Sequence, residues 1–174
     1  MEIPLARCTL RAWRRGDESS LVRYANNRNV WRNLRDRFPH PYTATDADEW
    51  IRTAGSDSPL TNFAIVVAGE AVGGTGLTLG KDVFRRSAEV GYWLGEPFWG
   101  RGIATEVLHA VTEYAFEYFD ICRLEAGVFE WNPASMRVLE KVGYVREARA
   151  RLGVTKDGHT GDRLLYALVR DWRA

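Results

Sequence analysis

Residues 88–108, with the sequence AEVGYWLGEPFWGRGIATEVL, decide the fold of this chain. Residues 88–95 have the character of a strand, and glycines at 95, 100 and 102 then interrupt that pattern. Apolar residues from Ile103 onward recur at helical spacing and predict an amphipathic helix of about 17 residues. Residues 122–131 alternate in polarity and predict another strand. A strand, a turn, a helix and a strand make a βαβ unit, so these two strands are expected to be parallel.

The next segment, NPASMRVLEKVGY at residues 132–144, predicts a second helix with defined ends. Asn132 is a favourable N-cap residue, and Pro133 suits the first helical position. Gly143 is placed to end the helix in a left-handed conformation. This helix therefore begins directly after the strand at 122–131.

The remaining segments predict a mixed sheet flanked by helices. Gly69-Glu70 and the stretch KDGHTGD at 156–162 are expected to form hairpin turns. Because hairpins flank the parallel pair, we expect an α/β (α+β) fold with a mixed, mostly antiparallel sheet. The further strands are expected at 7–14, 62–68, 71–79, 144–152 and 163–169, and the further helices at 17–27, with Asp17 as N-cap, and from Thr43 or Thr45 through Ile51.

Composition indicates one globular domain spanning residues 1–174, since the chain shows no linker and no tandem repeat. Hydrophobic residues make up 45% and charged residues 27% of the chain. The 24 basic and 23 acidic residues leave a net charge of +1, which argues against a nucleic-acid partner. No signal-peptide pattern and no apolar stretch of about 18 residues occurs, so we expect a cytoplasmic protein without a membrane partner. Three isolated histidines and two cysteines predict no metal site.

The turn at residues 99–105, WGRGIAT, has the features of a phosphate-binding site. A helix N-terminus offers unpaired N–H groups and partial positive charge, and small residues let a phosphate approach the backbone. A plain strand-to-helix turn would need the same glycines, so that alternative stays open here. Two other phosphate-loop patterns fail: Gly74 and Gly76 are followed by Leu79, and Gly80-Lys81 lacks the earlier glycine because residue 75 is threonine.

Together, residues 88–108 and 132–144 resemble the GNAT superfamily of acetyl-CoA-dependent N-acetyltransferases, and within it the RimJ/RimL-type branch. The superfamily loop Q/R-x-x-G-x-G/A is matched at Gly102 and Ala104, whereas its first position is Trp99. Residues 27–45 also resemble the region between the first two helices of that branch. The pattern N-x-x-S-x-x-x-L-E-K-x-G-[FY] is matched at Asn132, Ser135, Leu139, Glu140, Lys141, Gly143 and Tyr144.

The resemblance implies acetyl-CoA as cosubstrate and a parallel strand pair splayed at its site, with helices on both faces of the sheet. Main-chain atoms of the strand that leads into the turn would bind the pantetheine arm, and main-chain N–H groups of the turn would bind the pyrophosphate. The implied cofactor-binding residues are Tyr92, Trp93 and Leu94 in the strand, Arg101, Gly102, Ile103, Ala104 and Thr105 in the turn, and Asn132.

Ser135 and Glu89 are the catalytic candidates that the resemblance implies. Ser135 would protonate the leaving sulfur, since Leu139 stands where other superfamily members have a tyrosine. A solvated polar residue is the alternative for Ser135, and a helix cap is the alternative for Asn132. Glu89 would be the general base, although a structural acid paired with an arginine would look the same, and Glu147 is another acid to consider. The sequence leaves the identity of the base open.

The acceptor is expected to be an amine with a low pKa. Deprotonating a lysine amine of pKa ~10.4 at pH 7 costs about 4–5 kcal/mol, whereas an α-amine of pKa ~8 costs about 1 kcal/mol. A site without a strong base therefore favours the N-terminal α-amine of a protein, as in acetyltransferases of ribosomal proteins. Alternatives are a small-molecule amine, such as an amino acid, a polyamine or an antibiotic, and a non-catalytic acyl-CoA-binding module. By the resemblance, Arg35, Phe38 and Tyr42 would lie on the acceptor side, and a homodimer is implied.

Overall fold

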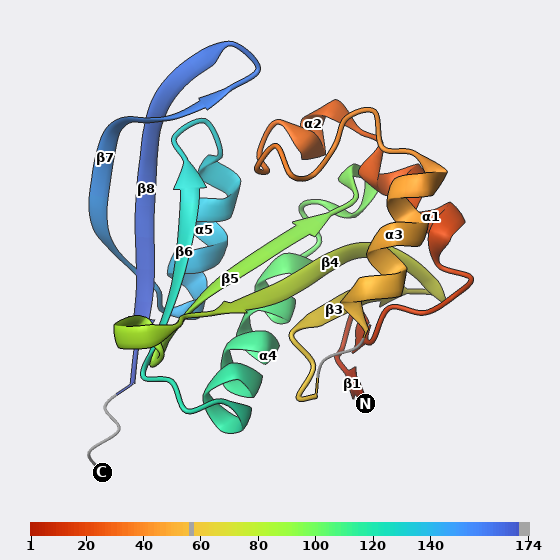
Figure 1. Ribbon diagram of the computed structural model, residues 1–174, viewed down its shortest axis with the longest axis horizontal. Coiled ribbons are helices and arrows are strands. Elements are labelled where there is room, and N and C mark those ends of the chain that lie inside the picture. Colours follow the sequence, from red (N-terminus) through yellow and green to blue (C-terminus); the bar gives the residue numbers. More distant parts are fainter. Residues whose placement is uncertain (56–57, 171–174) are drawn as a thin grey trace. The chain divides into compact units, whose positions relative to one another are not determined.

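The computed structural model (Figure 1) describes residues 1–55 and 58–170, and these contain five α-helices and eight β-strands. The strands hydrogen-bond to one another in the order β1-β2-β3-β4-β5-β6-β8-β7. Of the described pairings, β5 with β6 is parallel and the others are antiparallel. The expected α/β fold with a mixed, mostly antiparallel sheet and one parallel pair is therefore confirmed.

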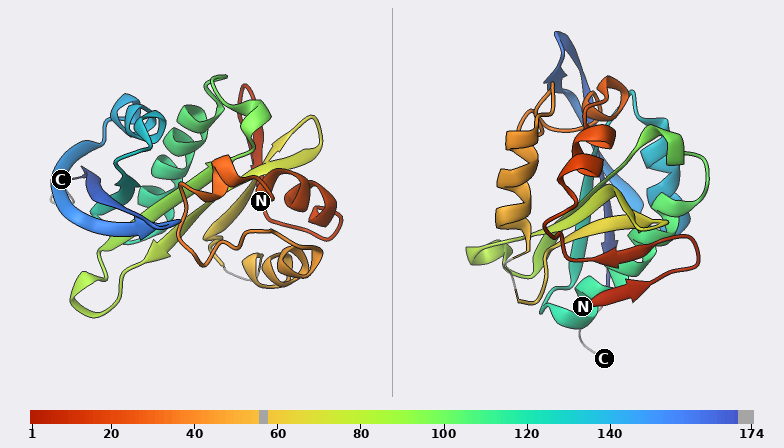
Figure 2. Two further views of the ribbon diagram at one scale, coloured as in Figure 1. Left: turned by 90° about the horizontal axis from the view of Figure 1, so that it is seen from above. Right: turned by 90° about the vertical axis from the view of Figure 1, so that its right-hand side faces the viewer.

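The first compact unit comprises residues 1–76 and 92–107. In Figures 1 and 2, α1 and α3 lie side by side and pack against its strands. Its core contains Trp13, Leu21 and Tyr42, with Trp93 and Phe38 packed at the edge. Its complete elements are β1 (Glu2–Pro4), β2 (Thr9–Arg11), α1 (Glu18–Ala25), α2 (Arg28–Trp31), α3 (Ala44–Ala54), β3 (Asn62–Val67) and the short 3-10 helix η2 (Glu96–Phe98), and it also holds most of β4 (Glu70–Leu79), the end of β5 (Ser87–Leu94) and the first turn of α4 (Ile103–Tyr118).

The second unit comprises residues 77–91 and those from 108 onward. Figure 1 shows α5 packed along β6 and β8. Alternation in β6 buries Leu124, Ala126 and Val128, the period expected when one face of a strand is covered. Its complete elements are η1 (Asp82–Phe84), β6 (Arg123–Phe129), α5 (Pro133–Val142), β7 (Val145–Lys156) and β8 (His159–Val169), and it also holds the ends of β4 and β5 that the first unit lacks and most of α4.

Both hairpin turns differ from the expectation. The β3–β4 turn consists of Ala68 and Gly69, with φ of 49° and 86°, and Glu70 is already paired with Val67. The β7–β8 turn is Asp157-Gly158, with φ of 54° and 74°, so the strands extend well into residues 156–162. Two-residue hairpin turns of this kind need positive φ at both central residues, and that requirement, rather than the polar composition, sets the strand ends.

Asp17 occupies the N-cap position of α1, as predicted, but its side chain does not cap the helix. The Asp17 side chain makes no cap hydrogen bond; its two oxygens each accept a hydrogen bond of 2.7 Å from the Arg11 guanidinium. Arg11 is 4% exposed and Asp17 is 5% exposed. Pairing a buried guanidinium with an anion stabilises the fold more than one side-chain cap would. Thr43, by contrast, forms a full capping box with Asp46 at the start of α3. The strand β1 and the one-turn helix α2 were not predicted, because each is too short to show a period.

Candidate active site

The turn between β5 and α4 has the geometry of an anion-binding site. Gly100 and Gly102 have φ of 73° and 77°, a conformation that a side chain would strain. The first intrahelical hydrogen bond of α4 runs from the Glu106 N–H to the Gly102 carbonyl. The N–H groups of residues 103–105 therefore precede the helical hydrogen-bond pattern and are available to a ligand. The helix dipole adds partial positive charge at this position.

Trp99 explains the departure from the superfamily loop. Its indole N–H donates a hydrogen bond of 2.6 Å to the Leu94 carbonyl, which closes the turn from η2 back to β5. The main-chain carbonyl of Leu94 is thus already engaged by a hydrogen bond within the chain. Arg101 is exposed, and its guanidinium lies 5.4 Å from the centre of the Phe98 ring, which orients it beside the turn.

Two further residues of the first unit support this turn. Glu106, in the first turn of α4, accepts hydrogen bonds from the main-chain N–H groups of Ala6 (2.7 Å) and Arg7 (3.1 Å). A Cβ added at Gly102 would lie 3.6 Å from Nε of Arg7, so a second guanidinium lies beside the turn. Neither residue was found from the sequence, because their contact spans about a hundred residues and follows no local pattern.

Glu96 connects the turn to α2. Its carboxylate accepts hydrogen bonds from Nδ2 of Asn27 (2.7 Å) and Nδ2 of Asn29 (3.0 Å). Asn27 also caps α2 by accepting the Asn29 N–H at 2.8 Å. The carboxylate therefore fixes the start of the segment that carries the acceptor-side candidates. No motif in the sequence marks Glu96 for this role.

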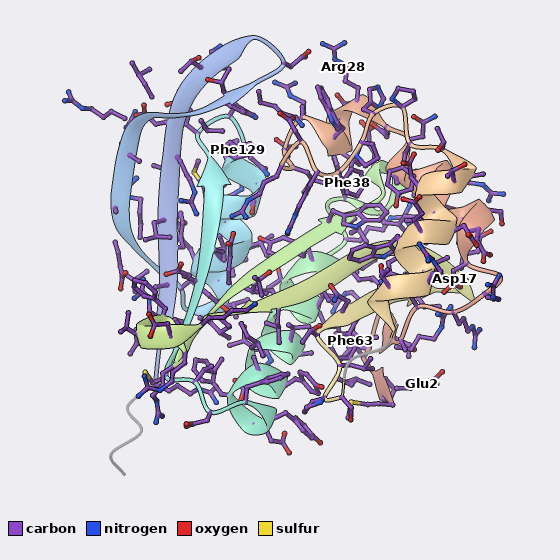
Figure 3. The ribbon with its side chains drawn as sticks, viewed as in Figure 1. Glu2, Asp17, Arg28, Phe38, Phe63 and Phe129 are labelled. Atoms are coloured by element: carbon purple, nitrogen blue, oxygen red, sulfur yellow. The ribbon has the colours of Figure 1, made fainter. Side chains whose placement is uncertain are left out.

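The acceptor-side candidates lie next to the end of β5. The Phe38 ring is 5.4 Å from the Trp93 ring and 5.0 Å from the Tyr42 ring, centre to centre. Figure 3 shows Phe38 in the loop that follows α2. Burial raises the pKa of Tyr42 to about 12, so its phenol stays protonated near neutral pH. Arg35 is exposed at the turn before Phe38 and adds a cation there.

Gly73 and Gly74 make room for Trp93. A Cβ at Gly73 would lie 2.4 Å from the Trp93 carbonyl oxygen, and one at Gly74 would lie 2.9 Å from Nε1 of Trp93. Both distances are shorter than real Cβ contacts, so only glycine fits at these two positions. Gly73 and Gly74 therefore serve the packing of Trp93. Tyr92, the remaining candidate in this strand, is half-buried.

Asn132 and Ser135 lie at the start of α5, in the second unit. Oδ1 of Asn132 accepts the main-chain N–H of Ser135 at 3.2 Å, so its role as N-cap is confirmed. The amide Nδ2 of Asn132 is not used in the cap. Ser135 is half-buried in the first turn, and Leu139, where other members have a tyrosine, is fully buried. A buried leucine therefore occupies this position, and it cannot donate a proton as a tyrosine would.

Glu89 lies in the parallel part of the sheet, within the second unit. The β5–β6 register pairs Ser87 with Arg123 and ends at Glu89 opposite Glu125, although both strands continue. Side chains of directly paired residues point to the same face, so the two carboxylates are neighbours. Arg123 donates to Glu125 at 3.1 Å and to Glu147 at 2.6 Å, which places Glu147 in a structural ion pair.

Cys8 is not a nucleophile. Burial, and to a smaller extent the Glu106 carboxylate, raises the pKa of its thiol to about 11, so it is neutral at physiological pH. Within residues 1–55 and 58–170, no group of three His, Cys, Asp or Glu side chains could hold a metal ion. None of the helices in those residues has the length and apolar character needed to cross a membrane.

The donor set fits the phosphate end of acetyl-CoA. Main-chain N–H groups of residues 103–105, with Arg101 and Arg7 beside them, suit a pyrophosphate, because they combine hydrogen-bond donors with positive charge. A side chain at Gly102 would require a strained φ at the point where a phosphate would approach this backbone.

Residues 7–145 match the acetyltransferase (GNAT) domain. The chain belongs to this family. The expected superfamily is thereby confirmed. Because the match covers most of the chain, the β5–α4 turn and α5 both lie inside it.

The chain spans about half the length of two curated relatives from Bacillus subtilis. "Probable N-acetyltransferase YjcK" is 40% identical over 84 residues, which cover 48% of this chain and 46% of YjcK. "Putative ribosomal N-acetyltransferase YdaF" is 35% identical over 92 residues, which cover 52% of this chain and 50% of YdaF.

A solved structure of RimL, the ribosomal L7/L12 α-N-protein acetyltransferase, in complex with coenzyme A superposes with a TM-score of 0.84. The superposition covers 97% of this chain and 98% of RimL at 20% identity, which shows a shared fold. Together with the name of YdaF, it agrees with the RimJ/RimL-type branch that the motifs resemble.

Proposed function

We propose that the protein is an acetyl-CoA-dependent N-acetyltransferase that acetylates an N-terminal α-amine directly, without a covalent enzyme intermediate. The observation that carries this proposal is the β5–α4 turn, where three main-chain N–H groups and two positive-φ glycines meet two arginines. The names of YdaF and RimL support an acceptor of the ribosomal-protein type.

Acetyl-CoA supplies an acetyl group activated as a thioester. The residues of the β5–α4 turn would bind its pyrophosphate, and the main chain of residues 92–94, except for the Leu94 carbonyl, would bind its pantetheine arm. Binding along a strand edge would order the arm without side-chain contacts, since each main-chain group is a strong donor or acceptor. The first unit therefore supplies most of the binding groups for the cosubstrate.

Glu89 would take the proton that the acceptor ammonium must lose, directly or through water. The amine nitrogen then forms its bond to the acetyl carbon and loses its second proton to solvent, and the bond from that carbon to sulfur breaks. Ser135 would donate its hydroxyl proton to the departing sulfur and regain a proton from solvent. The net reaction releases an N-acetylated acceptor, a free thiol and one proton.

The α-amine is favoured over a lysine amine by the weakness of the base. With a carboxylate as base, deprotonating a lysine amine at pH 7 would add about 4–5 kcal/mol to the activation free energy. An α-amine would add about 1 kcal/mol. Cys8 provides no alternative nucleophile, since its thiol is held neutral by burial. Direct transfer is therefore the simplest route.

A panel of amines tests the proposal, with thiol release from acetyl-CoA as the measurement. The panel contains peptides with free N-termini, the same peptides with blocked N-termini and one lysine, a polyamine and single amino acids. Release with the free peptides but not with the blocked ones is expected. Equal release with blocked lysine peptides would contradict the α-amine assignment. Coenzyme A binding without release for any amine would point to an acyl-CoA-binding module instead.

A further inference from the structure

Arg163 in β8 is half-buried, and its guanidinium makes no hydrogen bond or ion pair within the described residues. The two other half-buried arginines of the second unit each have a carboxylate: Arg86 lies 3.0 Å from Asp120, and Arg123 lies 2.6 Å from Glu147. A partly desolvated guanidinium without an anion is costly. Arg163 is thus a cation placed for a negative charge that this unit does not provide.

The guanidinium of Arg163 lies directly over the main chain of β6. A Cβ added at Gly127 would be 2.5 Å from Nε and 2.6 Å from Nη2 of Arg163. Any side chain at position 127 would therefore have to displace the guanidinium. Glycine at this position leaves room for Arg163, although the φ of Gly127 does not itself require glycine.

Arg163 and Glu89 lie on the same face of this part of the sheet. The register pairs Phe129 with Arg163 and Glu125 with Glu89, and alternate residues of β6 share a face. Figure 3 marks this end of β6 by Phe129. The other face holds Tyr166, whose hydroxyl donates to Glu140 of α5 at 2.9 Å, so α5 covers that face and not this one.

The spacing between the two groups is that of a small acidic acceptor. Gly127 is two residues beyond Glu125 along β6, a distance of about 7 Å in a strand. An amine held at Glu89 and a carboxylate held at Arg163 would thus be a few bonds apart. A polyamine, by contrast, would bring a second positive charge toward the guanidinium.

We propose that Arg163 binds a carboxylate that the acceptor carries close to its amine, so that the preferred acceptors are acidic N-termini or acidic amino acids. The inference rests on the proposed function, because it takes Glu89 as the group that receives the amine proton. Arg163 would act as a specificity-determining residue, with two N–H donors of its guanidinium directed to one carboxylate.

Matched acceptors test the proposal in the full-length protein. Peptides that begin with Glu or Gln, peptides with Glu or Gln in second place, and free glutamate beside glutamine are compared by kcat/KM. The wild type should prefer the acidic member of at least one pair, and the pair that responds distinguishes peptide from amino acid. Arg163→Met should lower that preference by about tenfold or more, the usual effect of removing a charge-assisted hydrogen bond. Arg163→Lys should restore part of it.

Arg137→Met is the control, since Arg137 is exposed on α5 and its loss changes the net charge equally. It should leave the preference unchanged. Gly127→Ala is a second variant, which displaces the guanidinium without removing it and should lower the preference in the same direction. Arg163→Met should keep its thermal midpoint, because Arg163 has no partner to lose.

An equal acid-to-amide ratio in the wild type and in Arg163→Met would overturn the proposal. Calorimetric binding of the N-acetylated acidic peptide, which needs no turnover, separates this failure from failure of the proposed function. Weaker binding to Arg163→Met than to wild type would support the carboxylate site even in the absence of any thiol release. Equal binding would reject it.

Discussion

Ser135 is the residue whose chemistry can be isolated most cleanly. Its main-chain N–H, not its hydroxyl, donates the hydrogen bond to the Asn132 side chain that caps α5. Ser135→Ala therefore keeps the start of α5 intact. We expect kcat to fall about 100-fold, since general acid catalysis commonly contributes 10²–10⁴-fold. The thermal midpoint should stay within a degree or two of wild type. A maximal rate within about twofold of wild type would show that the leaving sulfur takes its proton from another source.

Glu89 can be compared with its partner across the parallel strands. If Glu89 is the base, Glu89→Gln should lower kcat/KM and flatten the ascending limb of its pH profile, because that limb reports deprotonation of the free enzyme's base. Glu125→Gln removes the same charge at the paired position of β6 and should keep the limb. A preserved limb in Glu89→Gln and a flattened one in Glu125→Gln would exchange the two roles.

At the scale of elements, two effects of a side chain in the β5–α4 turn can be separated: backbone strain and obstruction of the ligand. Gly102→Val and Gly100→Ala both place a side chain at positive φ, which costs about 1–2 kcal/mol for alanine and more for the β-branched valine. We expect Gly102→Val to abolish coenzyme A binding while the protein stays folded, and Gly100→Ala to bind with little loss. Titration calorimetry with coenzyme A and circular dichroism provide the two measurements. Unfolding of Gly102→Val would favour a purely structural role for this turn.

Elements long enough to show a regular hydrophobic period could be predicted from the sequence. Features fixed by partners elsewhere in the chain could not. The helix from Ile103 and the cap at Asn132 follow from spacing and residue type alone, and both are confirmed. The Asp17 cap failed because Arg11, six residues earlier, captures the carboxylate. No sequence pattern shows that the Arg11 guanidinium will be buried and will take the Asp17 carboxylate as its partner.

The same limit applies to the candidate site. The turn at 99–105 could be found from glycines and a helix start, because its function depends on main-chain groups that any sequence supplies. Glu106, Glu96 and Arg163 could not, since each acts through a contact with a segment far away in sequence or in another strand. Side-chain partners therefore have to come from the three-dimensional arrangement.

At the scale of the whole molecule, three carboxyl groups couple stability to pH with the same sign. The Leu152 N–H (2.8 Å) and the Arg149 guanidinium lower the pKa of Asp162, and hydrogen bonds from Thr43 and from Arg123 lower the pKa values of Asp46 and Glu147. A carboxyl whose folded pKa lies below its unfolded value of about 3.9–4.3 stabilises the protein above that value, and the contribution is lost as the pH falls through the folded pKa.

Asp162 provides the test of this coupling, because it is 7% exposed and holds the bulge of β7 between Ala150 and Val154. Asp162→Asn should lower the free energy of unfolding at pH 7 and reduce its slope below about pH 4, so that the two proteins converge in acid. Urea unfolding from pH 7 to pH 3 measures both quantities. Asp48→Asn, at an exposed ion pair with Arg15, should run parallel to wild type. Parallel curves for Asp162→Asn would mean that the bulge is held by shape and main-chain hydrogen bonds, and that its carboxylate charge contributes nothing to the fold.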